Sequence, residues 1–211
     1  MRTGTADVAR VKDYPEFRAS REDVDDLLAS QRLGRLIALG DDGFPQVALH
    51  PYTWDNGVLE VHLVNHDEQL QAFRDNVRAA FEVDDVLSAS PSHFVDEENA
   101  TNADHFYRCV IMRGTLALSK DIAAVESHLK RLVAKYQPES RYAPIDRNDS
   151  RYGKYMAALT LIRLEPVEIR TKFKLGQHTG EESRAAIVKG MRHRAEGQDI
   201  RTADLLERHN R

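Results

Sequence analysis

Two short turn signals near the start of the chain constrain its fold more than any other feature. The tripeptides Asp41-Asp42-Gly43 and Asp55-Asn56-Gly57 separate three β-rich runs, over residues 34–40, 45–54 and 58–64. Asp-Gly and Asn-Gly between such runs favour hairpins, because both turn positions tolerate a positive φ. The segment therefore predicts three consecutive antiparallel strands.

The rest of the chain completes a predicted sheet with flanking helices. Further β-rich runs cover three ranges, 77–83, 107–118 and 157–173. Helical patterns cover four ranges, 21–28, 68–76, 121–136 and the tail 184–211. Polar connectors are expected over 84–104, as a long loop, and over 137–152. Six antiparallel strands with intercalated helices predict a mainly β (α+β) fold that closes into a barrel or a strongly curled sheet, since closure removes exposed strand edges.

Two residues refine these elements. Ser20 precedes acidic residues and an apolar helical pattern, which makes it the expected N-cap of the first helix. Pro166 lies inside the last strand run, where proline cannot donate a ladder hydrogen bond. A bulge or an edge position is therefore expected at Pro166.

Composition limits the class of protein. The chain has 211 residues, 41% of them hydrophobic, and a net charge of −4. This predicts one domain over residues 1–183 with a helical tail over 184–211, and it disfavours direct nucleic acid binding, which normally requires a basic patch. The only cysteine, Cys109, lies in an apolar run, so it is expected to be a small buried hydrophobe, and no intrachain disulfide can form.

No targeting or membrane segment is visible in the sequence. The start, residues 1–7, lacks the apolar core of a secretion signal, and no apolar run approaches the ~20 residues that span a bilayer. We therefore expect a cytoplasmic protein without a membrane partner.

The segment Lys172-Phe173-Lys174-Leu175-Gly176-Gln177 is the best candidate for binding chemistry. Strand alternation places Lys172 and Lys174 on one face and Phe173 on the other. A strand that ends in two lysines and then breaks at glycine before a new helix can point fixed donors at an anionic ligand. Taken alone, two lysines at a strand end are more often simply solvated.

Three segments together carry a family resemblance. They are the strand and turn order of residues 34–83, the Ser90-Pro91-Ser92-His93-Phe94 loop before an aromatic-rich strand that ends at Gly114, and the lysine segment described above. In combination they resemble the FMN-binding split-barrel superfamily, which includes pyridoxamine 5′-phosphate oxidase-like proteins and PaiB-type FMN-binding regulators. The resemblance covers roughly residues 20 to 195.

The resemblance implies a six-stranded antiparallel split β-barrel that forms a homodimer and holds FMN between its subunits. It implies FMN contacts from residues of five segments: His50, Pro51, Tyr52, Asn65, His66, Gln69, Ser92, Arg108, Lys172, Lys174 and Gln177. For His50 alone, plain strand packing is an equally good interpretation. Cations near a flavin tune its reduction, which gives the lysines a role in such a site.

One family feature is missing from the sequence. The segment 63–69, after the third strand, lacks the Arg or Lys that usually meets the FMN phosphate. Asn65, His66 and the amides of the following helix are the expected replacement donors. Asp67 and Glu68 carry negative charge at the same place and compete with them.

Three functions remain open at this level. The first is an FMN-dependent oxidoreductase of the pyridoxamine 5′-phosphate oxidase-like class, acting with an unknown small-molecule substrate or electron donor. The second is a PaiB-like flavin-binding regulator without turnover. The third is a heme-binding split barrel with His66, His93 or His105 as ligand. The histidines fit no compact ligand motif, so no metal site is predicted, and no hydrolytic triad is visible.

Overall fold

The computed structural model describes residues 14–40, 42–75 and 77–210. The N-terminal stretch 1–13 and Asp41 of the first predicted turn lie outside the described residues. The strands are β1 (Leu33–Leu39), β2 (Pro45–Pro51), β3 (Thr53–Asp55), β4 (Val58–Val64), β5 (Arg78–Ser90), β6 (Asp104–Ser119) and β7 (Leu159–Lys174). The α-helices are α1 (Arg21–Ser30), α2 (Gln69–Asp75), α3 (Ile122–Tyr136), α4 (Gly153–Ala157), α5 (Glu181–Arg194) and α6 (Asp199–His209). Single 3-10 turns cover Pro15–Phe17, Ser92–Phe94 and Ala100–Asn102.

The strands form one antiparallel sheet that curls into a barrel. Their order is β2-β1-β5-β6-β7-β4-β3. β2 and β3 lie at opposite ends of this order, yet only Tyr52 separates them along the chain, so the two ends of the sheet meet. The split-barrel prediction is confirmed, with seven strands in place of six because Tyr52 interrupts the predicted run 45–54. The Tyr52 side chain is fully buried, and its hydroxyl donates to the Leu28 carbonyl of α1.

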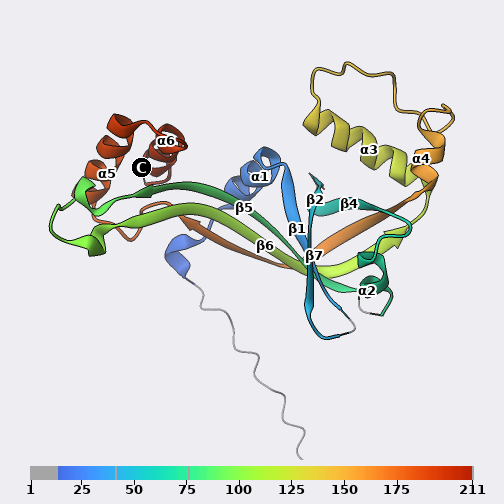
Figure 1. Cartoon of the computed structure of the whole chain (residues 1–211), viewed down its shortest axis with the longest axis horizontal. Helices are drawn as coiled ribbons and strands as arrows, with labels where there is room; N and C mark the ends of the chain where they lie inside the picture. Colours follow the sequence, from blue (N-terminus) through green and yellow to red (C-terminus); the bar gives the residue numbers. More distant parts are fainter. Residues whose placement is uncertain (1–13, 41, 76, 211) are drawn as a thin grey trace, which may run out of the picture.

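Three strands continue past the barrel and form an arm, which we define as residues 83–90, 104–110 and 170–174 (Figure 1). The prediction of a loop over residues 84–104 is therefore wrong for residues 84–90, which belong to β5. Only residues 91–103 connect β5 to β6. Asp85 resembles a loop residue in the sequence, but in the arm it lies on the buried face and is ion-paired to Arg108. That long-range pair compensates its charge.

One continuous hydrophobic core fills the barrel and the inner face of the arm. Ser20 is the N-cap of helix α1, as predicted, and forms a capping box with Asp23. The helix buries Val24, Leu27 and Leu28 in the same core as α2, α5 and α6. The last two helices form a pair over the far end of the arm (Figure 1) and insert Ile187, Val188, Met191, Leu205 and Leu206.

The free edges of the arm are protected by local hydrogen bonds. On β5, the Ser88 amide donates to Thr202 Oγ1 of α6. Beside β7, the Ala19 amide donates to the hydroxyl of Thr171, so the segment before α1 lies along that strand. Covering an edge in this way prevents pairing with foreign strands.

Helix α3 covers a different surface, the outside of the barrel at β4 and β7, over a smaller second core. His128 of α3 is completely buried there. Its Nε2 lies 3.0 Å from Nδ1 of His62, and its Nδ1 lies 3.4 Å from the carboxylate of Glu60.

Burial, together with the neighbouring His128 and His50, lowers the pKa of His62 to about 4. Burial opposes ionisation of Glu60, but hydrogen bonds from His128, Arg131 and Arg163 outweigh it and lower the pKa of Glu60 to about 2.

A β-bulge at Val167 confirms the predicted irregularity at Pro166. Gly114 pairs with Pro166 and Arg113 with Glu168, so Val167 has no partner on β6 and is 84% exposed. A Cβ on Gly114 would lie 2.3 Å from the Glu165 carbonyl oxygen, which is backbone and cannot yield easily. Glycine is needed for this close approach.

We expect Gly114→Ala to lower the free energy of unfolding by about 1–3 kcal/mol, because the added methyl group overpacks the bulge. Gly180→Ala is the matched control, since a Cβ there meets nothing within 4 Å. Urea unfolding followed by circular dichroism measures both. Equal stability of the two variants would show that the bulge adapts to a side chain.

The low pKa of His62 predicts a loss of stability in mild acid. The unfolded chain protonates this imidazole near its ordinary pKa of 6.5, and the folded chain only near 4. Stability from neutral His62 is complete above about pH 6.5 and declines as the pH falls toward 4, by up to about 3 kcal/mol. His62→Gln should flatten this decline between pH 7.5 and 5 in urea unfolding. The exposed His66 provides the control variant His66→Gln, and an unchanged pH profile in His62→Gln would contradict the assignment.

Candidate functional site

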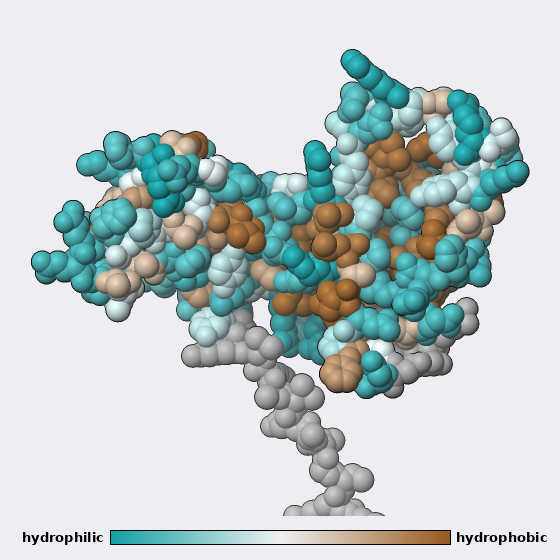
Figure 2. Space-filling view, in the orientation of Figure 1, coloured by the Kyte–Doolittle hydropathy of each residue, from teal (hydrophilic) through white to brown (hydrophobic). Residues whose placement is uncertain are grey.

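The face of the sheet opposite the main core is the first candidate site. Paired residues share a face, so the register of β2, β1, β5, β6 and β7 identifies the side chains on this outer face. Six of its apolar side chains are 37–70% exposed: Leu33, Leu39, Val47, Leu49, Val86 and Ile111. Figure 2 shows apolar side chains gathered in the middle of the molecule, where β1 and β2 run in Figure 1. Contiguous exposed apolar surface of this kind marks an interaction site.

A band of charged groups crosses the middle of the outer face. The guanidinium of Arg35 on β1 pairs with Asp84 and, at 3.4 Å, with Glu82 on β5. The Cys109 thiol on β6 lies 3.7 Å from the same Glu82. Burial, with Glu82 and Asp84 nearby, raises the pKa of Cys109 to about 12, so the thiol remains protonated at neutral pH and cannot serve as a nucleophile.

The two predicted lysines lie on the outer face at the arm. Lys172 pairs across the ladder with Cys109, and Lys174 with Tyr107, while Phe173 is buried on the opposite face, as alternation predicted. The Lys172 ammonium lies 5.6 Å from the centre of the Tyr107 ring and 5.0 Å from that of Tyr14. A hydrogen bond with Tyr107 is the main cause of a raised pKa for Lys172.

Lys174 is held differently. Its ammonium pairs with Asp104 at the start of β6, and His178 Nε2 lies 3.0 Å from the same carboxylate. Asp104 therefore balances much of the positive charge at this end of the arm. Lys172 is the more available of the two cations, since its neighbours are neutral rings.

The predicted residues of the barrel lie around β2, β4 and α2. His50 Nε2 lies 2.8 Å from the Gln69 amide oxygen, and Gln69 is buried and donates to the Leu36 carbonyl. Tyr52 belongs to the core, whereas Pro51 pairs with Leu33 and is exposed. His66 is exposed in the turn after β4. The half-buried Asn65 is bonded to the chain segment before β7.

The remaining predicted residues point elsewhere. Arg108 is 3% exposed on the inner face, where it donates to Asp85 and to Asp26. Gln177 folds back on its own segment, donating to the Phe173 carbonyl and accepting from the Leu175 amide. Ser92 begins the 3-10 turn at the far end of the arm, near α5. The structure thus places Pro51, Lys172 and Lys174 on one face and Tyr52 and Arg108 inside the molecule.

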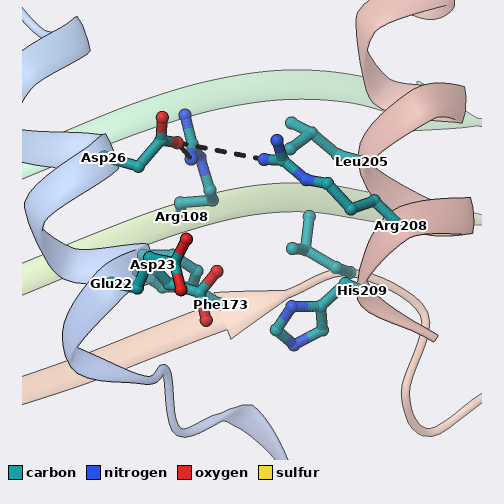
Figure 3. A pocket seen from close by; sticks show the side chains of 9 residues that line it. Glu22, Asp23, Asp26, Arg108, Phe173, Leu205, Arg208 and His209 are labelled. Carbon is teal, nitrogen blue, oxygen red and sulfur yellow. Dashed lines mark hydrogen bonds and ion pairs between the residues drawn. The ribbon is translucent and has the colours of Figure 1, made fainter. Parts of the chain in front are cut away.

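The sequence predictions missed a polar cleft on the inner side of the arm. Its cavity of about 280 Å³ lies between α1 and α6 over the sheet. Acidic residues of α1 (Glu22, Asp23, Asp26) face basic residues of α6 (Arg208, His209) across a floor of Arg108, Phe173 and Leu175. Figure 3 shows Asp26 and Arg208 on opposite walls, 3.9 Å apart, beside Arg108. No short motif signals this cleft, because its walls are about 180 residues apart in the chain.

The floor of this cleft is a compensated charge network. Asp85 accepts from Arg108 and, through both oxygens, from Arg201 of α6. Burial opposes ionisation of Asp85, but the hydrogen bonds from Arg201 and Arg108 outweigh it and lower its pKa. The network ties α6 to the sheet, so its first role is structural.

The described residues form neither a metal-binding cluster nor a membrane-spanning helix. In residues 14–40, 42–75 and 77–210, no three His, Cys, Asp or Glu side chains converge to hold a metal ion. No helix in that part of the chain is both long and apolar enough to cross a bilayer.

Solved structures share this fold. The flavocytochrome Anf3 from Azotobacter vinelandii is 20% identical, with a TM-score of 0.64 over 85% of this chain and 80% of its own. The FAD and heme binding protein from Mycobacterium smegmatis is 20% identical, with a TM-score of 0.62 over 80% of this chain and 78% of its own. A conserved hypothetical protein from Mycobacterium tuberculosis is 18% identical, with a TM-score of 0.62 over 79% of this chain and 93% of its own.

Sequence comparison gives the family. No curated protein matches the chain. The family model described as pyridoxamine 5′-phosphate oxidase matches residues 20–173, which run from the cap of α1 to the end of β7 and include the whole barrel and most of the arm. The chain therefore belongs to the pyridoxamine 5′-phosphate oxidase family of split-barrel proteins.

Proposed function

We propose that this protein is a flavin-binding oxidoreductase that works as a homodimer, with the outer face of each sheet turned toward the partner subunit. The observation that carries the proposal is the exposure of Leu33, Val47 and Leu49 on a continuous sheet face. A monomer would leave this apolar surface in water. Two copies that meet there would bury it and enclose a space for a flat ring system.

The ring of a flavin fits this face better than its phosphate does. Val47 and Leu49 offer an apolar wall, and the exposed end of β2 at Pro51 offers backbone groups. Lys172, on the same face, is a cation that would favour the reduced, anionic ring. A bound flavin supplies the redox chemistry, and the chain supplies position, apolar cover and charge.

Pairing is needed because one chain does not bring the predicted residues together. Four strands, β1, β5, β6 and β7, span the sheet from Pro51 on β2 to Lys172. At about 4.8 Å per strand this distance approaches 20 Å, more than one ring system covers. In the proposed dimer, the barrel of one copy and the arm of the other contribute to the same site.

The relatives support a flavin without specifying its form. One neighbour is named for FAD and heme, and another is named a flavocytochrome. The sequence resemblance implies FMN, and FMN is the flavin that we propose here. Turnover separates an oxidoreductase from a regulator that only senses the flavin, and reduction of the bound flavin by NADH or NADPH would demonstrate it.

We expect the purified protein to bind flavin and show absorption bands near ~450 and ~370 nm, the signature of the oxidised ring. Leu49→Lys should weaken flavin binding by about tenfold or more, because it places a charge in the apolar wall. Ile200→Lys, on α6, is the control, since it is also exposed but lies away from the outer face. Titration of flavin into apoprotein, followed by fluorescence, measures both variants.

Two results would count against the proposal. If the wild-type protein binds no flavin at micromolar concentration, the proposal of a flavin cofactor is wrong. If Leu49→Lys and Ile200→Lys weaken flavin binding equally, the flavin does not bind at the outer face.

A further inference from the structure

The turn between β4 and α2, residues 65–68, contains little that could hold a flavin phosphate. This is the turn where the family resemblance places the phosphate, and it is acidic, with Asp67 and Glu68 in sequence. We propose that the protein recognises its flavin through the ring and not through the 5′-phosphate, so that riboflavin and FMN bind alike. This inference rests on the proposed function and narrows its ligand class.

Both polar atoms of the Asn65 side chain are hydrogen-bonded within the protein. Its Nδ2 donates to the Ala157 carbonyl at 3.0 Å, and its Oδ1 accepts from Thr160 Oγ1 at 2.7 Å. Its backbone amide donates to the Ala158 carbonyl at 2.8 Å. These three bonds tie the turn to the segment leading into β7. Turning any of these groups toward a phosphate would leave its present partner unpaired, which costs about as much as the new bond contributes.

Backbone amides at the start of α2 are also hydrogen-bonded within the protein. The Gln69 amide is capped by the Asp67 carboxylate at 2.9 Å, and the Asp67 amide donates to the Val64 carbonyl at 2.9 Å. The Gln69 side chain is buried between His50 and the Leu36 carbonyl. A carboxylate of the chain thus occupies the position at which a helix N-terminus would accept an external anion. A phosphate there would have to displace Asp67.

Charge also opposes a phosphate at this turn. Glu68 is exposed, and Asp67 is held at the helix start, so two carboxylates belong to the turn at which the resemblance places the dianion. Burying a phosphate without a compensating cation is costly. The exposed His66 ring has no hydrogen bond or ion pair within the part of the chain that the structure describes. A phosphate in this setting remains in water and adds little to affinity.

The direct test is a pair of titrations of full-length apoprotein with riboflavin and with FMN, followed by quenching of flavin fluorescence. The expected dissociation constants agree within about threefold, and neither depends strongly on salt. FMN binding that is tighter by more than about tenfold, and weakens as salt is added, would overturn this inference while leaving the proposed function intact. Failure of both flavins to bind would overturn the proposed function, and this inference with it.

A gain-of-function variant locates the effect at the turn. Glu68→Arg replaces a carboxylate by a guanidinium there, and we expect it to tighten FMN binding by about tenfold or more while leaving riboflavin unchanged. Glu97→Arg is the matched control, because it makes the same charge change at an exposed residue of the loop between β5 and β6. Equal effects of the two variants on FMN would show that the phosphate does not lie at the β4–α2 turn, and would overturn the inference.

Discussion

The hydrogen-bonded ladder of β5, β6 and β7 is the element on which the rest of this structure depends. These strands are 13 to 16 residues long, and they serve the barrel with one part and the arm with the other. Because the same ladder runs through both parts, one face is buried over its whole length by α1, α2, α5 and α6. On the other face, α3 covers the first part of β7, and much of the remainder is exposed. The proposed flavin site and subunit contact both follow from that exposed part.

Local signals in the sequence predicted most of the barrel. The two glycine turns, the Ser20 cap and the irregularity at Pro166 depend on neighbours within a few residues, so the chain itself carries the information. The extension of β5 to Ser90 was missed because Asp84 and Asp85 look like loop residues. Their partners, Arg35 for Asp84 and Arg108 and Arg201 for Asp85, come from distant segments. Only the folded structure shows that these charges are compensated.

The same difference explains how well the candidate site could be predicted. Alternation along β7 correctly placed Lys172 and Lys174 on one face and Phe173 on the other, since that depends only on strand geometry. The inward direction of Arg108 depends on ion pairs with α1 and the arm, which no short motif encodes. The polar cleft between α1 and α6 could not be predicted for the same reason. The lack of an Arg or Lys after β4 could be recognised, because it is read directly from a few consecutive residues.

Sedimentation velocity of the purified protein tests the central claim most directly, because the account requires the outer face to be a contact between two copies. We expect a dimer at micromolar concentration, and a monomer after the double substitution of Val47 and Leu49 by lysine. Both side chains are more than half exposed, so the substitutions should leave each chain folded. A wild-type monomer over the whole concentration range, or a dimer that survives both substitutions, would contradict it.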